Sequence, residues 1–195
     1  MSRLEIIDGT GSGKRAAVNS ANWLETFAVS ESRMADISVR EGQSFILTSD
    51  FISLSTTASF SGVFYLKDAD ATKVIYIDKI RICGTGTSMG YVQCKLTKNP
   101  TTGTLISDQT AAITVPANLG ASTDFVGTVY KGADSKTVTD GTQFSQFTVH
   151  LPGHTTQEYD GALVLTGGTS FAIEVKPSYA TELCIEVQCW IEDKK

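Results

Sequence analysis

The chain has 195 residues, of which 41% are hydrophobic and 19% charged, and its formal net charge is -5. That length can bury a sizeable core, and a charged fraction below the usual value of about 25% predicts a surface rich in Ser, Thr, Asn and Gln. The mild negative charge and the scattered Lys and Arg residues argue against nucleic acid as a partner, because phosphate binding requires clustered basic side chains.

The sequence shows no targeting or membrane segment. Its N-terminal stretch, MSRLEIIDGT, lacks the apolar run of a signal peptide. No stretch approaches the roughly 20 apolar residues that cross a bilayer. We therefore expect synthesis in the cytoplasm and no membrane partner.

Residues 1–43 differ from the remainder because they show little hydrophobic alternation. Their glycine-rich run, DGTGSGKR, superficially resembles a phosphate-binding loop. A Walker A loop has Gly where this chain has Asp8, and Ser or Thr where it has Arg15. The run is therefore interpreted as a flexible connector.

The same segment carries several large apolar side chains. A short helix capped by Ser20 and an extended arm are both compatible with their spacing. Ordering the backbone costs about 1–2 kcal/mol per residue, and the segment has no core of its own, so these side chains need a partner surface. We predict an N-terminal docking arm over residues 1–43, a separate body over residues 44–195, and partner-binding residues Trp23, Leu24, Phe27, Val29 and Met34.

Extended segments follow one another steadily from Ser44. Phe45–Leu54 reads as one long strand or as two short strands broken at Ser49-Asp50. The next three segments are joined by connectors too short for a crossover helix, which predicts an antiparallel meander at the centre of the body. These segments are Gly62–Lys67, Val74–Cys83 and Met89–Leu96.

The second half of the body continues in the same way. Thr104–Ser122 is broken by Pro and Gly and is predicted to form short strands or a covering loop. Asp124–Tyr130 and Phe144–Leu151 are predicted strands. A hairpin is expected from Ala162–Leu165 and Ser170–Lys176, and the most regular alternation occurs in Leu183–Ile191.

About eight to ten short strands with Gly and Pro in the turns, and no helical period in the body, predict an all-β protein. The number and length of the strands favour an antiparallel β-sandwich of jelly-roll type, in which two sheets close over one core. The predicted fold is therefore a jelly-roll β-sandwich with an extended N-terminal arm.

The four cysteines match no common zinc spacing. Cys83 and Cys94 lie on successive predicted strands and can approach each other, but a reducing compartment disfavours a disulfide. Buried thiols that act as small hydrophobes are the favoured interpretation for Cys83, Cys94, Cys184 and Cys189.

The remaining reactive residues do not form a recognisable catalytic pattern. His150 and His154 are four apart with Pro-Gly between them, whereas cupin metal motifs place two histidines two apart on a strand. Glu158 is the remaining candidate ligand. Asp68, Asp70, Asp108, Asp134, Asp140 and Asp160 fall in predicted turns, where solvated turn formers are common. We therefore predict no catalytic, cofactor-binding or metal residues, no cofactor and no enzymatic activity.

Several stretches, taken in their order along the chain, resemble structural proteins of tailed bacteriophages. The leader DGTGSGKRAAVNSANWL, starting at Asp8, resembles a leader that precedes an all-β domain in that group. SGVFYLKD from Ser61 and IYIDKIRI from Ile75 resemble two of its strands. LVLTGGTSFAI from Leu163 resembles its hairpin, with Thr-Gly in place of Pro-Lys, and the acidic end of Glu186–Asp193 also fits.

The resemblance implies a virion protein of the capsid decoration or cement type, with a jelly-roll body that is often trimeric. It implies the major capsid protein or other virion proteins as partners, with the virion as the final location. The alternative is a glycan-binding module of a tail fibre or spike, for which Tyr91, Tyr130, Tyr159 and Trp190 are candidate stacking residues.

Overall fold

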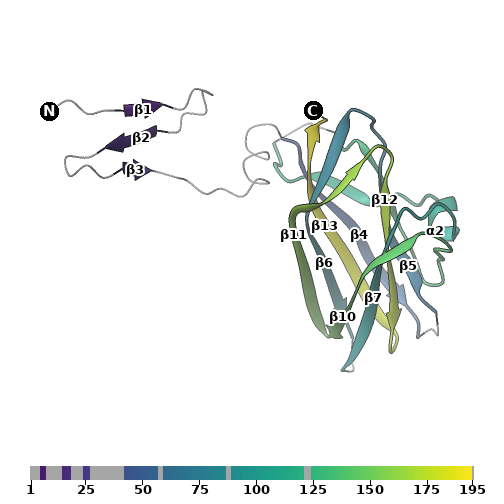
Figure 1. Cartoon of the computed structure of the whole chain (residues 1–195). Coiled ribbons are helices and arrows are strands. Elements are labelled where there is room, and N and C mark those ends of the chain that lie inside the picture. Colours follow the sequence, from purple (N-terminus) through teal and green to yellow (C-terminus); the bar gives the residue numbers. More distant parts are fainter. Residues whose placement is uncertain are drawn as a thin grey trace. The chain divides into compact units, whose positions relative to one another are not determined.

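A computed structural model of the chain describes residues 5–7, 15–18, 24–26, 42–56, 59–86, 89–120 and 124–194. The chain divides into two units, Met1–Ser32 and Arg33–Lys195 (Figure 1). The prediction of an all-β antiparallel sandwich is confirmed for the second unit, which holds two five-stranded antiparallel sheets. Among the described residues, no helix is long and apolar enough to span a bilayer.

The first unit contains a small antiparallel sheet of order β1-β2-β3, formed by Glu5–Ile7, Arg15–Val18 and Leu24–Thr26. The glycine-rich run therefore joins two antiparallel strands, whereas a phosphate-binding loop joins a strand to a helix. Leu24 lies in β3, so the helical alternative is wrong at residues 24–26. Trp23, Phe27, Val29 and Met34 lie outside the described residues.

The two sheets of the sandwich face each other in Figure 1 and have the strand orders β10-β7-β12-β5-β9 and β11-β6-β13-β4-β8. A single short helix, α2 (Thr104–Ser107), is described between β7 and β8. The strands are β4 (Ser44–Leu54), β5 (Ser61–Asp68), β6 (Lys73–Thr85), β7 (Gly90–Lys98), β8 (Ile113–Pro116), β9 (Gly127–Lys131), β10 (Thr142–Leu151), β11 (Gly153–Thr166), β12 (Ser170–Pro177) and β13 (Thr181–Asp193).

The strand pairing is nested, and this nesting defines the jelly roll. β4 pairs with β13, β5 with β12, β6 with β11, and β7 with β10. The sandwich is thus a long antiparallel hairpin, β4–β7 against β10–β13, that rolls up into two sheets. Residues between β7 and β10 supply β8 and β9, which extend the two sheets beyond β4 and β5.

Two predicted pairings are wrong. β5, β6 and β7 do not form a meander, because β6 belongs to one sheet and β5 and β7 to the other. β11 and β12 do not form a hairpin for the same reason. A connector of a few polar residues can turn within a sheet or arch across to the opposite one, and connector length does not distinguish the two.

The open alternative for Phe45–Leu54 is resolved in favour of one strand, β4, which contains a bulge. Thr48 pairs with Glu186 and Phe51 with Cys184, so two residues of β4 lie opposite Ile185 alone. The Ser49 hydroxyl accepts a hydrogen bond of 2.9 Å from the Ile185 amide, and Asp50 takes a positive φ of 60°. The predicted break is therefore a local bulge that leaves the strand continuous.

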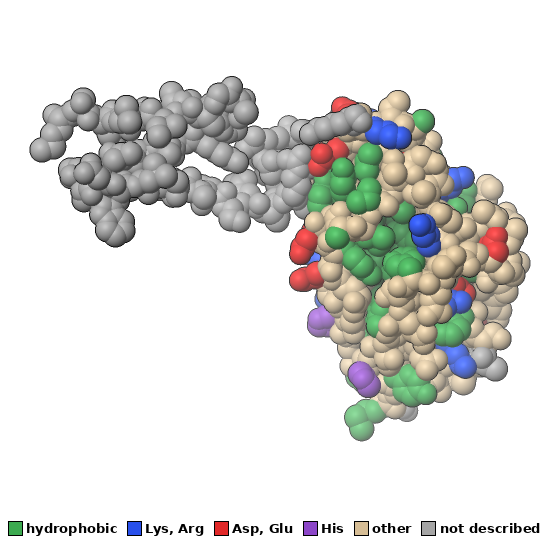
Figure 2. All heavy atoms as spheres, in the orientation of Figure 1, with side chains coloured by type: hydrophobic (Ala, Val, Ile, Leu, Met, Phe, Trp, Pro, Cys, Tyr) green, Lys and Arg blue, Asp and Glu red, His purple; other side chains and the backbone are tan. Residues whose placement is uncertain are grey.

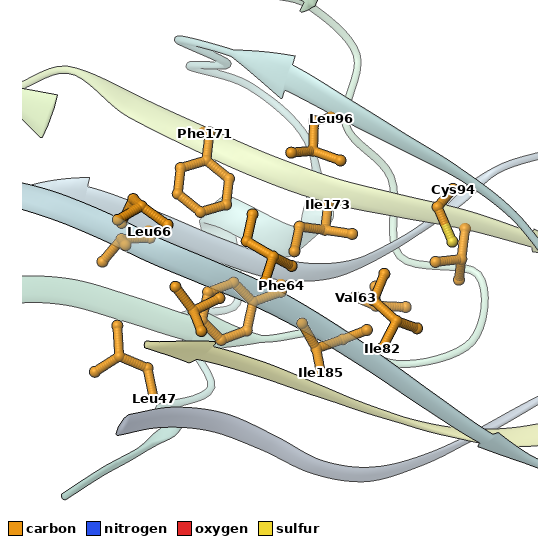
Figure 3. Packing of buried hydrophobic residues seen from close by; sticks show 14 of the residues in the cluster. Leu47, Val63, Phe64, Leu66, Ile82, Cys94, Leu96, Phe171, Ile173 and Ile185 are labelled. Carbon is orange, nitrogen blue, oxygen red and sulfur yellow. The ribbon is translucent and has the colours of Figure 1, made fainter. Parts of the chain in front are cut away.

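The core lies between the two sheets, where alternate residues of every long strand meet (Figure 3). The predicted inward face of the last strand is confirmed, and so is the predicted buried face of β7. The fully or almost fully buried residues of these two faces are Leu183, Ile185, Val187, Cys189, Ile191, Val92, Cys94 and Leu96.

Candidate interaction surface

The structure separates the two histidines. His150 lies on β10 opposite Tyr91, and His154 lies on β11 opposite Cys83. Both side chains are exposed, and their strands belong to different sheets. Glu158 lies opposite Lys79. Within the described ranges, no three His, Cys, Asp or Glu side chains converge as metal ligands do.

Burial divides the cysteines into two pairs. Cys94 and Cys189 are fully buried, as predicted for thiols that act as small hydrophobes. Burial raises the pKa of Cys94 to about 12. The predicted approach of Cys83 to Cys94 is wrong, because β6 and β7 belong to different sheets, and the residue opposite Cys83 is Cys184.

Three of the six acidic turn residues accept hydrogen bonds from backbone amides, namely Asp68, Asp70 and Asp140. Asp140 accepts hydrogen bonds from the Thr101 hydroxyl and from the Thr101 and Thr102 amides. Asp70 accepts two hydrogen bonds from Thr72. Asp68 contradicts the prediction of a solvated turn residue, because its side chain is fully buried at the end of β5, where it accepts a hydrogen bond from the Asp70 amide.

Acid titration of Asp140 provides a first prediction. The hydrogen bonds, with that of the Thr101 hydroxyl the largest contributor, lower the pKa of Asp140 from 3.8 to about 2. A lowered pKa in the folded state stabilises the fold above pH 3.8, and this contribution disappears as the pH falls through about 2. We expect the side-chain carboxyl resonance of Asp140 to titrate near pH 2 and the stability difference from Asp140→Asn to shrink over that interval. A titration midpoint of the Asp140 carboxyl near 3.8 would contradict these hydrogen bonds.

A pocket of about 390 Å³ opens on the outer face of the first sheet. It is lined by Tyr65 and Lys67 of β5, by residues 99–101 after β7, by Ile106 and by the β11–β12 turn at residues 167–170. Lys67 and Tyr65 are its ionisable side chains. Among the described residues, the lining contains no carboxylate, histidine or cysteine.

The four aromatic residues considered for glycan stacking do not share a surface. Trp190 is only 4% exposed and stacks on Tyr76 with ring centroids 5.3 Å apart. Tyr130 stacks on Tyr65, and Tyr159 packs against the core. Tyr91 is the exposed member of the set, at 46%. The predicted exposure of Trp190 is therefore wrong, and Tyr130 and Tyr159 are half-buried.

The two sheets end in four edge strands, and three of these are short, covered or interrupted. Since β8 pairs only with Phe45–Thr48, the outer side of β4 beyond Thr48 also has no strand partner among the described residues. β8 has four residues and ends in Pro116, which has no amide to donate. The free edge of β9 is covered by residues 110–112 through hydrogen bonds that involve Thr110, Ala112, Val129 and Lys131. The cover removes the free edge of β9, whereas β8 leaves an edge of only four residues for further pairing.

β11 is protected by a different device. Between Glu158 and Leu163, four residues lie opposite Asp78 alone, which makes a wide bulge. The bulge brings Gly161 against Trp190, where a Cβ atom would lie 2.4 Å from the indole ring, and Gly161 has a φ of 79°. Only glycine has no Cβ to clash with the indole ring and also adopts this positive φ without strain. The bulge and the charges of Glu158 and Asp160 interrupt this edge.

β10 is the remaining edge and carries none of these devices over Ser145–Leu151. After an irregularity at Phe144, these seven residues pair regularly with β7. They contain no Lys, Arg, Asp, Glu or Pro. Phe147, Val149 and Leu151 turn towards the core, and Gln146, Thr148 and His150 are exposed. No described residue pairs with the other side of β10, so its backbone groups are available to another strand.

A second exposed feature lies on the opposite side of the sandwich. Ile113 and Val115 of β8 are 47% and 36% exposed, and Leu119 just after the strand is 86% exposed. We call these three residues the β8 patch. β10 packs beside β11, and β9 packs beside β4, so β10 and the β8 patch occupy opposite ends of the two sheets. On the face shown in Figure 2, charged side chains are scattered and do not form a patch of one sign.

Comparisons of the chain with protein-family models, with curated proteins and with solved structures find no match.

The β10 edge was not identified from the sequence, although a signal was present. The run TQFSQFTVHL, which forms β10, contains no Lys, Arg, Asp or Glu. Alternation identified the strand but did not show whether it was central or at an edge, because that depends on pairing with distant β7.

Proposed function

We propose that this protein is a non-enzymatic structural component of a bacteriophage virion that decorates or cements the capsid through protein–protein contacts. The observation that carries the proposal is the unprotected edge of β10, together with the β8 patch. The phage assignment itself comes from the sequence resemblance described above.

The β10 edge supports contact by strand addition. Ser145–Leu151 offers seven residues of regular backbone at the end of a sheet. An added strand gains main-chain hydrogen bonds and side-chain contacts on the two faces of the sheet. Uncharged side chains on β10 impose no desolvation penalty for a charge and no repulsion of a partner.

The arrangement of the two exposed features supports a ring of identical subunits. β10 and the β8 patch lie at opposite ends of the sheets, so one copy can present β10 to the β8 side of the next. Such head-to-tail contacts form a closed ring when the rotation that relates successive subunits divides a full turn evenly. A self-complementary patch instead gives a dimer. The proposed assembly is a homotrimer that contacts the major capsid protein or other virion proteins.

The N-terminal arm is the proposed attachment element. Its apolar residues Trp23, Leu24, Phe27, Val29 and Met34 are the proposed contacts with the capsid. Three arms on one trimer bind through avidity, which strengthens attachment by about 10²–10⁴-fold beyond one arm when the geometry permits simultaneous binding.

A charge on the β10 edge tests the proposal. Thr148 is exposed on β10, and we expect Thr148→Lys to weaken self-association at least about tenfold, because a Lys on an edge strand opposes strand addition. Ala180→Lys is the matched control, since it adds the same charge to an exposed turn between β12 and β13, which are both inner strands of their sheets. Sedimentation velocity measures the subunit equilibrium, and cosedimentation with purified capsids measures attachment.

The outcomes separate the proposal from its alternative. Trimers that dissociate in Thr148→Lys and persist in Ala180→Lys support it. Equal association of both variants contradicts the role of β10. Binding to a glycan array that is lost in Tyr91→Ala, without binding to capsids, favours the fibre or spike module.

A further inference from the structure

Cys83 and Cys184 are the two cysteines that lie outside the core. They are half-buried, and they lie directly opposite each other on β6 and β13. The neighbouring residues Ile82, Leu183 and Ile185 are fully buried in the core. Because side chains alternate along a strand, both thiols therefore point to the outer face of the second sheet.

The pairing places the two thiols within reach of a covalent bond. Directly opposed residues on antiparallel strands have Cα atoms about 4.5 Å or about 5.5 Å apart, depending on the kind of pair. Disulfides join residues whose Cα atoms are about 4.4–6.8 Å apart. Both values fall in that range, so the Cα separation of this pair permits a bond between Cys83 and Cys184.

The surroundings leave the pair open to a small reagent. The Cys184 sulfur lies 3.4 Å from the Thr48 hydroxyl, and Phe51, the residue opposite Cys184 on β4, is 59% exposed. His154, opposite Cys83 on β11, is also exposed. Burial raises the pKa of Cys83, Arg81 lowers it, and the nearby Cys184 raises it further. Alkaline conditions therefore favour the reactive thiolate.

We propose that Cys83 and Cys184 are an oxidative modification site that forms an intramolecular disulfide by exchange with a small-molecule disulfide such as oxidised glutathione. One protein thiolate attacks a sulfur of the reagent and releases one glutathione thiolate. The second protein thiol then loses its proton and attacks the mixed disulfide, releasing the second glutathione. The protein loses two hydrogen atoms, and the reagent is reduced to two thiols.

The bond links β6 and β13, two of the three inner strands of the second sheet. β13 pairs with both β6 and β4, and the bond joins residues about 100 positions apart in the chain. The chemistry is independent of the proposed function. A virion protein would be exposed to oxidising small-molecule disulfides when it leaves the reducing cytoplasm.

The test uses the full chain at about pH 8.5, where thiolates are more abundant, with excess oxidised glutathione. Remaining thiols are then alkylated under denaturing conditions, and the disulfides are mapped by mass spectrometry. Trypsin alone leaves Cys83 and Cys94 in one peptide and Cys184 and Cys189 in another. Glutamyl endopeptidase, which cleaves after Glu186, and chymotrypsin, which cleaves after Tyr91, are therefore added to separate each pair.

We expect one link between Cys83 and Cys184, with Cys94 and Cys189 alkylated. In Cys184→Ser the link is absent and Cys83 carries glutathione. The oxidised protein should unfold about 5–15 °C higher than the reduced protein, and Cys83→Ser should abolish this shift. Four alkylated thiols after treatment, or a link that involves Cys94 or Cys189, would overturn the proposal.

Discussion

Deletion of residues 1–40 is expected to leave a folded sandwich that binds capsids at least about a hundredfold more weakly than the full chain, because attachment through several arms is lost. Among the described residues, the sandwich core begins at Phe45, which lies beyond the deleted segment. The Gln43 carbonyl still accepts a hydrogen bond of 2.9 Å from the Ile191 amide, so the start of β4 remains bound to β13.

The measurement is cosedimentation of the truncated and full-length proteins with capsids, with circular dichroism as the test of folding. Full-length Trp23→Ala and Phe27→Ala provide controls that keep the length of the chain. They should weaken attachment while leaving thermal unfolding of the sandwich unchanged. Truncated protein that binds capsids as tightly as the full chain would exclude the arm as the attachment element.

Replacement of Phe64 by Ala is expected to lower the free energy of unfolding by about 3–5 kcal/mol. Phe64 lies on β5, pairs with Ile173 of β12 and is fully buried between the sheets (Figure 3). The loss combines the transfer energy of the ring with the cavity that remains, since both sheets hold the surrounding side chains in place.

Phe51→Ala is the matched control, because it makes the same chemical change on a strand where the ring is 59% exposed. We expect it to change stability by less than about 1 kcal/mol. Urea titration followed by far-ultraviolet circular dichroism compares the two variants. Similar losses for both would contradict the placement of Phe64 in the shared core.

The local alternation of residues predicted most strands of the sandwich correctly, and it did so best where burial is one-sided. In β13, Leu183, Ile185 and Val187 are buried between less buried neighbours, so the period of two is clear. The first part of β11 was missed, because its residues from Gly153 to Asp160 are polar or exposed on an edge. An edge strand with few core contacts leaves little hydrophobic signal.

Strand partners were harder to predict than strands. Short turns suggested that β5, β6 and β7 pair with one another, but each pairs with strands from the other half of the chain. The position of Cys83 shows the same difficulty, since its neighbour Cys184 is known only from the register of β6 against β13. Such register depends on packing across the core, which sequence periodicity does not contain.

The nested pairing has a consequence for biosynthesis. β13 occupies an inner position between β6 and β4, yet it emerges from the ribosome after every other strand of the sandwich. Before β13 is synthesised, no strand pairs with β4 and β6 between them, and the apolar faces of the second sheet stay exposed to solvent. Nascent chains should therefore depend on protection from aggregation until synthesis has passed Asp193, and closure should then proceed slowly, because most contacts join distant parts of the chain.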